Sequence, residues 1–147
     1  MSAETSVVNF ELGPFEASAT MLTPTLNGVS LCDLVSEFEA AEGFDVVGGY
    51  DGLVLDNFNF GDLAKYLLGR AGPKQRRGVV ALLGCDCGEF YCWPLEARVT
   101  VDQGRAVWDQ FKQPHRPERD YTRFGPFEFD EQQYRAALAD VLSTLET

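Results

Sequence analysis

Basic side chains are scarce in this sequence, and nearly all of them lie in its second half. Residues 1–69 contain eleven Asp and Glu but only one base, Lys65, whereas residues 70–147 contain twelve acids and eleven bases. The formal net charge is −11. So acidic a surface would repel phosphates, which argues against nucleic acid as the ligand. It is compatible with a basic protein partner, although acidity also serves solubility alone.

Long hydrophobic runs are also lacking. No apolar stretch approaches the roughly 20 residues of a membrane-spanning helix, so we expect no membrane association. Residues 1–6 contain no basic region that leads into an apolar core, so we expect no signal peptide and a cytoplasmic location. The chain has 147 residues, no internal repeat and no long linker, which predicts a single domain over 1–147.

Alternating apolar residues predict an antiparallel hairpin near the start of the chain. Residues 7–12 and 15–22 both alternate, and Gly13-Pro14 between them is typical of a turn. Pro24 is expected to end or interrupt the second strand, because proline cannot donate to a strand ladder.

Two further strand patterns follow in the second half. The run from Val79 to Leu83 is entirely apolar, which predicts a short strand buried on both faces. Residues 95–101 alternate between apolar and polar, and the turn residues at 102–104 lead into a return strand over 105–111.

Helices are predicted at three places. Ser30 is typical of an N-cap and Gly43 of a helix end, with Glu37, Glu39 and Glu42 on the outer face between them. A second helix is expected near 61–69. Asp130 caps the third, with Gln133 as its capping-box partner. Phe127 and Phe129 before it would face the same way in an extended segment, as a hydrophobic staple onto this helix or, alternatively, as a partner-binding patch. Together these patterns predict an α+β fold, a mainly antiparallel sheet with about three helices packed mostly on one face.

A cysteine-rich segment follows the apolar strand. Cys85, Cys87 and Cys92 are closely spaced, and His115, the single histidine, lies between two prolines. Thiolates and imidazole suit zinc, so these four residues predict a possible Cys3His site. The spacing is unusual for structural zinc, and buried thiols or a disulfide or redox pair are the alternatives. We expect Cys32, within the first helix, to serve packing.

Catalysis by one of these cysteines is another hypothesis. His115 would act as the base, and Asp109 or Asp120 would orient its ring. The loop around His115 also carries Lys112, Arg116, Arg119 and Arg123, which could bind an anion. Because Glu118 and Asp120 lie among these bases, we expect internal salt bridges instead.

Three motifs in the C-terminal half resemble a family of small bacterial proteins of uncharacterised function. They are Leu83-Gly-Cys-Asp-Cys-Gly-Glu with Cys92-Trp-Pro-Leu, then Gln113-Pro-His-Arg, then Phe124-Gly-Pro-Phe-Glu-Phe-Asp. The resemblance implies a bacterial source and transfers no activity, ligand or catalytic residue to this chain.

The function favoured by these observations is a non-enzymatic protein-binding domain of the immunity or inhibitor type. Its acidic N-terminal half would recognise the partner, and its cysteine segment would be structural. The alternative is a zinc-dependent or cysteine-based enzyme or redox protein that uses Cys85, Cys87, Cys92 and His115.

Overall fold

The computed structural model describes residues 5–15, 19–57, 62–70, 78–85 and 93–145. Its strands are β1 (Val8–Phe15), β2 (Ala19–Leu26), β3 (Val29–Ser30), β4 (Tyr50–Asp51), β5 (Leu53–Val54), β6 (Val79–Cys85), β7 (Leu95–Asp102), β8 (Arg105–Lys112) and β9 (Phe127–Asp130). Its helices are α1 (Leu31–Glu42), α2 (Leu63–Leu67) and α3 (Glu131–Leu145), with a 3-10 turn, η1, at Leu55–Asn57.

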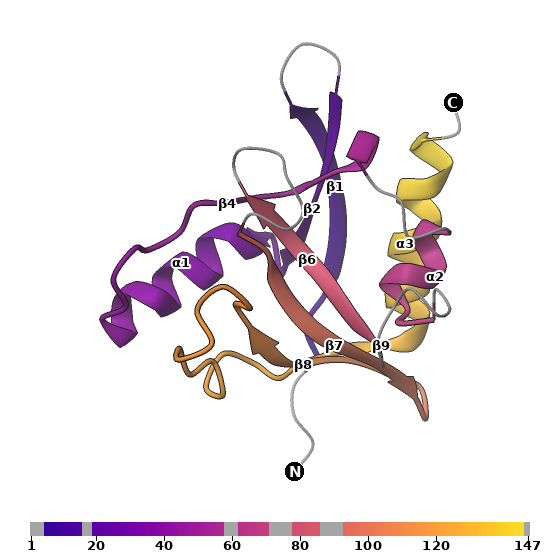
Figure 1. The fold of residues 1–147 in the computed structure, drawn as a ribbon. Coiled ribbons are helices and arrows are strands. Elements are labelled where there is room, and N and C mark those ends of the chain that lie inside the picture. Colours follow the sequence, from indigo (N-terminus) through magenta and orange to yellow (C-terminus); the bar gives the residue numbers. More distant parts are fainter. Residues whose placement is uncertain (1–4, 16–18, 58–61, 71–77, 86–92, 146–147) are drawn as a thin grey trace.

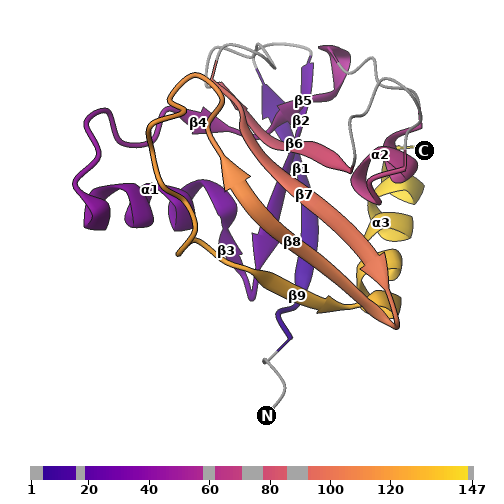
Figure 2. The ribbon, with the colours of Figure 1, turned by 60° about the horizontal axis from the view of Figure 1, so that its bottom comes forward.

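The strands form two antiparallel sheets. One has the order β1-β2-β3, with β5 also paired to β2, and the other has the order β4-β6-β7-β8-β9. The strands of the second sheet run diagonally across the β1–β2 hairpin (Figures 1 and 2). In both views α1 lies to the left of these strands and α3 to their right. The predicted α+β class is confirmed. Within the described residues, no helix is long and apolar enough to span a membrane.

The N-terminal hairpin forms as predicted, but its turn does not lie at Gly13–Pro14. Gly13 pairs with Met21 and Phe15 with Ala19, so both turn candidates lie inside the ladder. Pro24 does not end β2 either. It lies between the residues of β2 that pair with β5 and those that pair with β3, where it faces β1 alone. The long-range pairing of β1 with β2, which continues past both prolines, outweighs their local turn preference.

The predictions for the second sheet are confirmed. Strand β6 is buried along nearly its whole length, and β7 alternates between buried and exposed residues. The β7–β8 turn holds Gln103 and Gly104 at φ 52° and 78°, the left-handed pair that a tight hairpin needs.

Local capping explains where α1 and α3 begin. The Ser30 hydroxyl accepts from Cys32 N in α1, and Gly43 ends that helix at φ 74°. The Asp130 carboxylate accepts from Gln133 N at 3.1 Å, and the Phe129 ring packs 5.6 Å from Tyr134 as the predicted staple. The prediction that the Gln133 side chain completes a capping box is wrong.

The Gln133 side chain instead connects α3 to β1. Its Oε1 accepts from Val8 N at 3.1 Å and its Nε2 donates to Val8 O at 2.6 Å. The side-chain amide thus pairs with both the N–H and the C=O of Val8, as a neighbouring strand would. The long-range pair of hydrogen bonds is therefore favoured over the local box.

An aromatic cluster joins the two sheets to α3. Trp108 of β8 lies 4.8 Å from Phe129 and 6.5 Å from Phe10 of β1, centroid to centroid. Its Nε1 donates to the Tyr134 hydroxyl at 3.1 Å, and that hydroxyl donates to Leu67 O of α2 at 2.5 Å. The buried polar groups of this cluster thus satisfy one another.

Substitution of Tyr134 by Phe tests this relay. It leaves the Trp108 indole N–H and the Leu67 carbonyl without partners, at about 1–3 kcal/mol for each buried group. We expect the free energy of unfolding, measured in urea, to fall by about 2 kcal/mol or more. The variant Gln132→Ala, an exposed change in the same helix, is the control and should change stability by about 0.5 kcal/mol at most.

Candidate functional site

The predicted zinc ligands lie only partly within the described residues. Cys85 is buried at the end of β6, where it pairs with Tyr50 of β4, and His115 is exposed in the loop after β8. Cys87 and Cys92 lie outside the described residues. No group of three or more His, Cys, Asp and Glu side chains that could hold a metal ion exists in the part of the chain that the structure describes. The Cys3His site therefore stays a prediction.

Glu39 is not on the outer face of α1, which corrects the prediction. Its side chain is 0% exposed, while Glu37 is exposed and Glu42 is partly exposed. The segments after α1 and after β8 cover Glu39 with hydrogen-bond donors. A buried carboxylate is tolerated only with such partners.

Five groups contribute to the Glu39 network, defined here as Glu39, Gly48, Tyr50, Arg119 and Tyr121. Oε1 of Glu39 accepts from Gly48 N at 2.8 Å. Its Oε2 accepts from the Tyr50 hydroxyl at 2.8 Å, the Tyr121 hydroxyl at 2.6 Å and Arg119 Nη1 at 3.2 Å. Both carboxylate oxygens thus accept hydrogen bonds inside the protein.

The Arg119 guanidinium holds the network in place. Its Nη2 donates to the carbonyls of Asp45 and Val46, the latter at 2.7 Å, and its charged carbon lies 5.0 Å from the Phe44 ring and 5.6 Å from the Trp93 ring. Arg119 therefore uses hydrogen bonds and cation–π contacts together.

Trp93 extends this arrangement to the residues after the cysteine segment. Its Nε1 donates to Gly48 O at 2.9 Å, and Arg116 lies 5.0 Å above its ring. Gln113, only 1% exposed, donates to the Tyr50 hydroxyl at 3.4 Å and accepts from His115 N at 3.0 Å. The loop that carries His115 is thereby tied to α1 and β4.

The expectation of internal salt bridges for the basic loop is confirmed. Arg119 pairs with Glu39, Arg123 with Glu42 at 2.7 Å, and Lys112 with Glu96 at 3.9 Å. Their partners come from α1 and β7 and not from the neighbouring Glu118 and Asp120. Asp120 instead accepts from the Thr122 backbone and hydroxyl.

Two tyrosines of the network have pKa values above the ordinary value of a tyrosine. Burial, followed by hydrogen bonds to Tyr121 and Glu39, raises the pKa of Tyr50 above its ordinary value. Burial and the hydrogen bond to Glu39 likewise raise the pKa of Tyr121. Near neutral pH both are fixed donors, so the network acts as a structural clamp between α1 and the two loops.

Substitution of Glu39 by Gln should weaken this clamp strongly. It leaves the buried Arg119 without its counter-charge. Breaking a buried ion pair by removing one partner typically lowers the stability by about 3–5 kcal/mol. We expect a loss of that size in the free energy of unfolding from urea denaturation. Glu37→Gln, an exposed change two residues away in the same helix, is the matched control and should shift stability by about 0.5 kcal/mol at most. Equal effects of the two changes would contradict the buried role of Glu39.

The raised tyrosine pKa values predict a loss of stability at high pH. Above about pH 10 the unfolded tyrosines lose their protons while the folded ones keep them, so the folded state binds more protons. The free energy of unfolding should then fall with pH, by about 1.4 kcal/mol per pH unit for each such tyrosine. We would measure the free energy of unfolding by urea denaturation at successive pH values above 9. It should fall less steeply with pH in Tyr50→Phe/Tyr121→Phe than in the unchanged protein, and equal slopes in the two proteins would contradict the prediction.

A separate acidic hollow lies beside the N-terminus of α1. It measures about 380 Å³, and its lining includes Glu11, Thr23, Thr25, Cys32, Tyr50 and Asp51. Glu11 comes from β1 and Asp51 from β4, so the fold brings together acids that are 40 residues apart in the sequence. Sequence reasoning missed this site because no local pattern reports which strands become neighbours.

The acids around the hollow are not neutralised by bases. Among the described residues, the lining acids Glu11 and Asp51 form no ion pair, and neither do Asp33 and Glu37 of α1. Asp51 accepts a hydrogen bond from the adjacent Gly52 N. The Thr25 hydroxyl, in a residue only 4% exposed, has no hydrogen-bond partner in this part of the chain. The hollow therefore offers unused acceptors to a cationic group.

Cys32 lines the same hollow as a protonated thiol. Burial raises its pKa, and the charges of Asp51 and Asp33 raise it further. A thiol with a raised pKa is a poor nucleophile near neutral pH. This agrees with the predicted packing role and shows that both acids act on one small region.

Comparison with protein-family models, with curated proteins and with solved structures finds no match for this chain.

Proposed function

We propose that the protein is a non-enzymatic binding domain that recognises a basic protein partner, in the manner of an immunity or inhibitor protein. We place it in the bacterial cytoplasm, in keeping with the family that its motifs resemble. The observation that carries the proposal is the acidic hollow, where Glu11 and Asp51 lie beside the N-terminal turn of α1 and form no ion pair with any described residue.

The distribution of ion pairs supports this assignment. In the described N-terminal half, Glu39 and Glu42 are the acids that form ion pairs, and their partners Arg119 and Arg123 come from the basic loop. The remaining acids of α1 and its neighbours keep their charge available at the surface. A net charge of −11 also accelerates encounter with a basic partner over distances of about 8 Å at physiological salt.

The hollow is suited to a Lys or Arg side chain from the partner. Carboxylates at its rim would pair with the cation, and the threonine hydroxyls inside would accept its remaining N–H groups. Release of water from this partly enclosed site would strengthen such a pair relative to one on an open surface. The enzyme alternative depends on Cys85, Cys87, Cys92 and His115, two of which lie outside the described residues, and it stays a prediction.

Binding of an arginine-rich nonapeptide, measured by fluorescence anisotropy, tests the proposal. We expect the affinity to fall steeply with added salt and to drop by about tenfold or more in Glu11→Gln/Asp33→Asn/Asp51→Asn.

The control variant carries the same change in net charge away from the hollow, as Asp102→Asn/Glu118→Gln/Asp140→Asn. These three residues are exposed, and their loss should change the affinity by less than about threefold. If both triple variants bind equally weakly, the peptide responds to overall charge and the hollow is not the recognition site. Affinity that ignores salt and both variants would overturn the acidic-surface proposal.

A further inference from the structure

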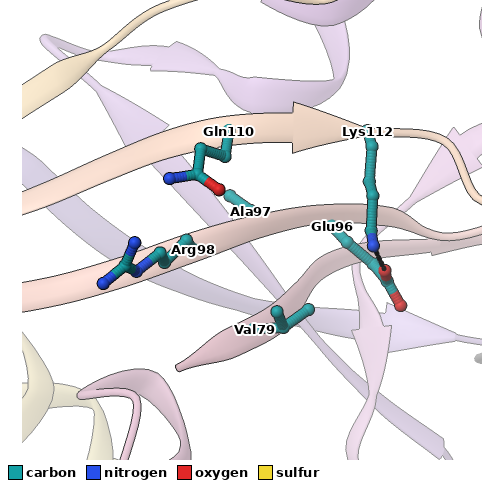
Figure 3. Close-up of a pocket in the computed structure, with 6 residues that line it drawn as sticks. All are labelled: Val79, Glu96, Ala97, Arg98, Gln110 and Lys112. Atoms are coloured by element: carbon teal, nitrogen blue, oxygen red, sulfur yellow. Dashed lines mark ion pairs between the residues drawn. The ribbon is translucent and has the colours of Figure 1, made fainter. Parts of the chain in front are cut away.

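A second hollow, of about 520 Å³, lies on the outer face of β7 and β8 at the edge of β6. Its lining residues are Val79, Glu96, Ala97, Arg98, Gln110 and Lys112 (Figure 3). It shares no lining residue with the acidic hollow, and it mixes both signs of charge with an apolar floor.

Irregular strand pairing creates this hollow. Across β7 and β8, Glu96 pairs with Lys112 but Arg98 pairs with Asp109, so β8 carries one extra residue between these pairs. Gln110, in this bulge, has φ 53°, a conformation that L-residues seldom adopt. A second register shift between β6 and β7 lies beside it, at Ala81 and Leu83. Bulges bend strands and redirect side chains, and they are frequent beside functional sites.

The polar groups of the hollow do not satisfy one another. Glu96 Oε1 is buried and accepts no hydrogen bond, because the Lys112 ammonium, 3.9 Å away, is beyond hydrogen-bonding distance. The Glu96 side chain as a whole is 15% exposed, so a ligand can approach the carboxylate although Oε1 itself is buried. Arg98 is exposed, and within the described residues its guanidinium has neither a hydrogen bond nor an ion pair, although Asp109 lies opposite it.

We propose that this hollow binds a small linear zwitterion, with its ammonium at Glu96 and its carboxylate at Arg98. Figure 3 shows the Glu96 and Arg98 side chains on either side of Val79, so the ligand's apolar spacer would lie over Val79. The Arg98 fork matches a carboxylate with two parallel hydrogen bonds. The ligand's ammonium would supply the hydrogen bond that Lys112 does not make to Glu96.

The charges exclude simpler ligands. A plain anion would meet the Glu96 carboxylate, and a plain cation would meet both Arg98 and Lys112. Glu96 and Arg98 are two residues apart on one strand, so their backbones are separated by about 6.6 Å. Figure 3 shows the two side chains extending away from each other, so their charged ends are farther apart than their backbones. The two charges of an α-amino acid are too close together to reach both ends, which leaves an ω-amino acid or a dipeptide.

Isothermal titration calorimetry with 6-aminohexanoate, glycylglycine, hexylamine and hexanoate tests the proposal. We expect one of the zwitterions to bind at least tenfold more tightly than either singly charged compound. Hexanoate or hexylamine binding as tightly as the zwitterions would overturn it. The proposal would also be overturned if neither zwitterion, at up to about 10 mM, gave more heat than buffer alone. Any affinity would then be too weak to mark a built site.

Point variants locate the binding. Arg98→Gln and Glu96→Gln should each lower the affinity for the zwitterion by about tenfold or more, because each removes a charge-assisted contact. Arg105→Gln, which removes an exposed base at the other end of β8, should leave the affinity unchanged, and circular dichroism should confirm that each variant is folded. Equal loss in all three variants would contradict binding at this hollow. The triple variant of the acidic hollow should bind the zwitterion normally, which separates this inference from the proposed function.

Discussion

The buried Glu39 carboxylate is the constraint on which the arrangement of α1 and the long loops depends. It accepts from three side chains and one backbone amide, and its partners lie on the segment before β4, on β4 itself and on the loop after β8. A buried charge is stable only if all its acceptor positions are used. The loops therefore have little freedom to adopt other arrangements while α1 stays in place.

The Glu39 network and the aromatic cluster around Trp108 stabilise the fold in different ways. Around Trp108, burial of large rings joins the two sheets to α3, with hydrogen bonds that only complete the packing. Around Glu39, charge and directional hydrogen bonds determine the geometry, and the rings of Phe44 and Trp93 shield the ion pair from water. The first provides most of the apolar burial, and the second specifies how the loops lie.

The clamp also explains how the two halves of the chain differ in charge at the surface. Bases of the second half, Arg119 and Arg123, are used internally to hold acids of α1. Among the described residues, Glu11 and Asp51 of the first half remain unpaired at the acidic hollow. The hollow on β7 and β8 differs in character, because it combines the bases Arg98 and Lys112 with the acid Glu96. One fold thus presents two surfaces with different chemical preferences.

Local patterns were sufficient for much of the fold. Strict alternation over 95–101 with Gln103-Gly104 predicted the β7–β8 hairpin, and Ser30, Gly43 and Asp130 marked helix ends, because capping and tight turns depend on neighbouring residues alone. The same local logic failed at Gly13–Pro14, where the long-range pairing of β1 with β2 outweighed the turn preference. It failed again at Gln133, whose partner, Val8, is 125 residues away.

The candidate site was less accessible to sequence reasoning than the fold. The sequence by itself determined the α+β class, the acidic first half and the cysteine segment. The tertiary structure alone decided that Glu39 is buried while Glu37 is exposed, and that Glu11 and Asp51 share one hollow. The physical reason is that burial and electrostatic pairing depend on which distant segments meet, and one-dimensional periodicity reports only the direction in which each side chain points along its own element.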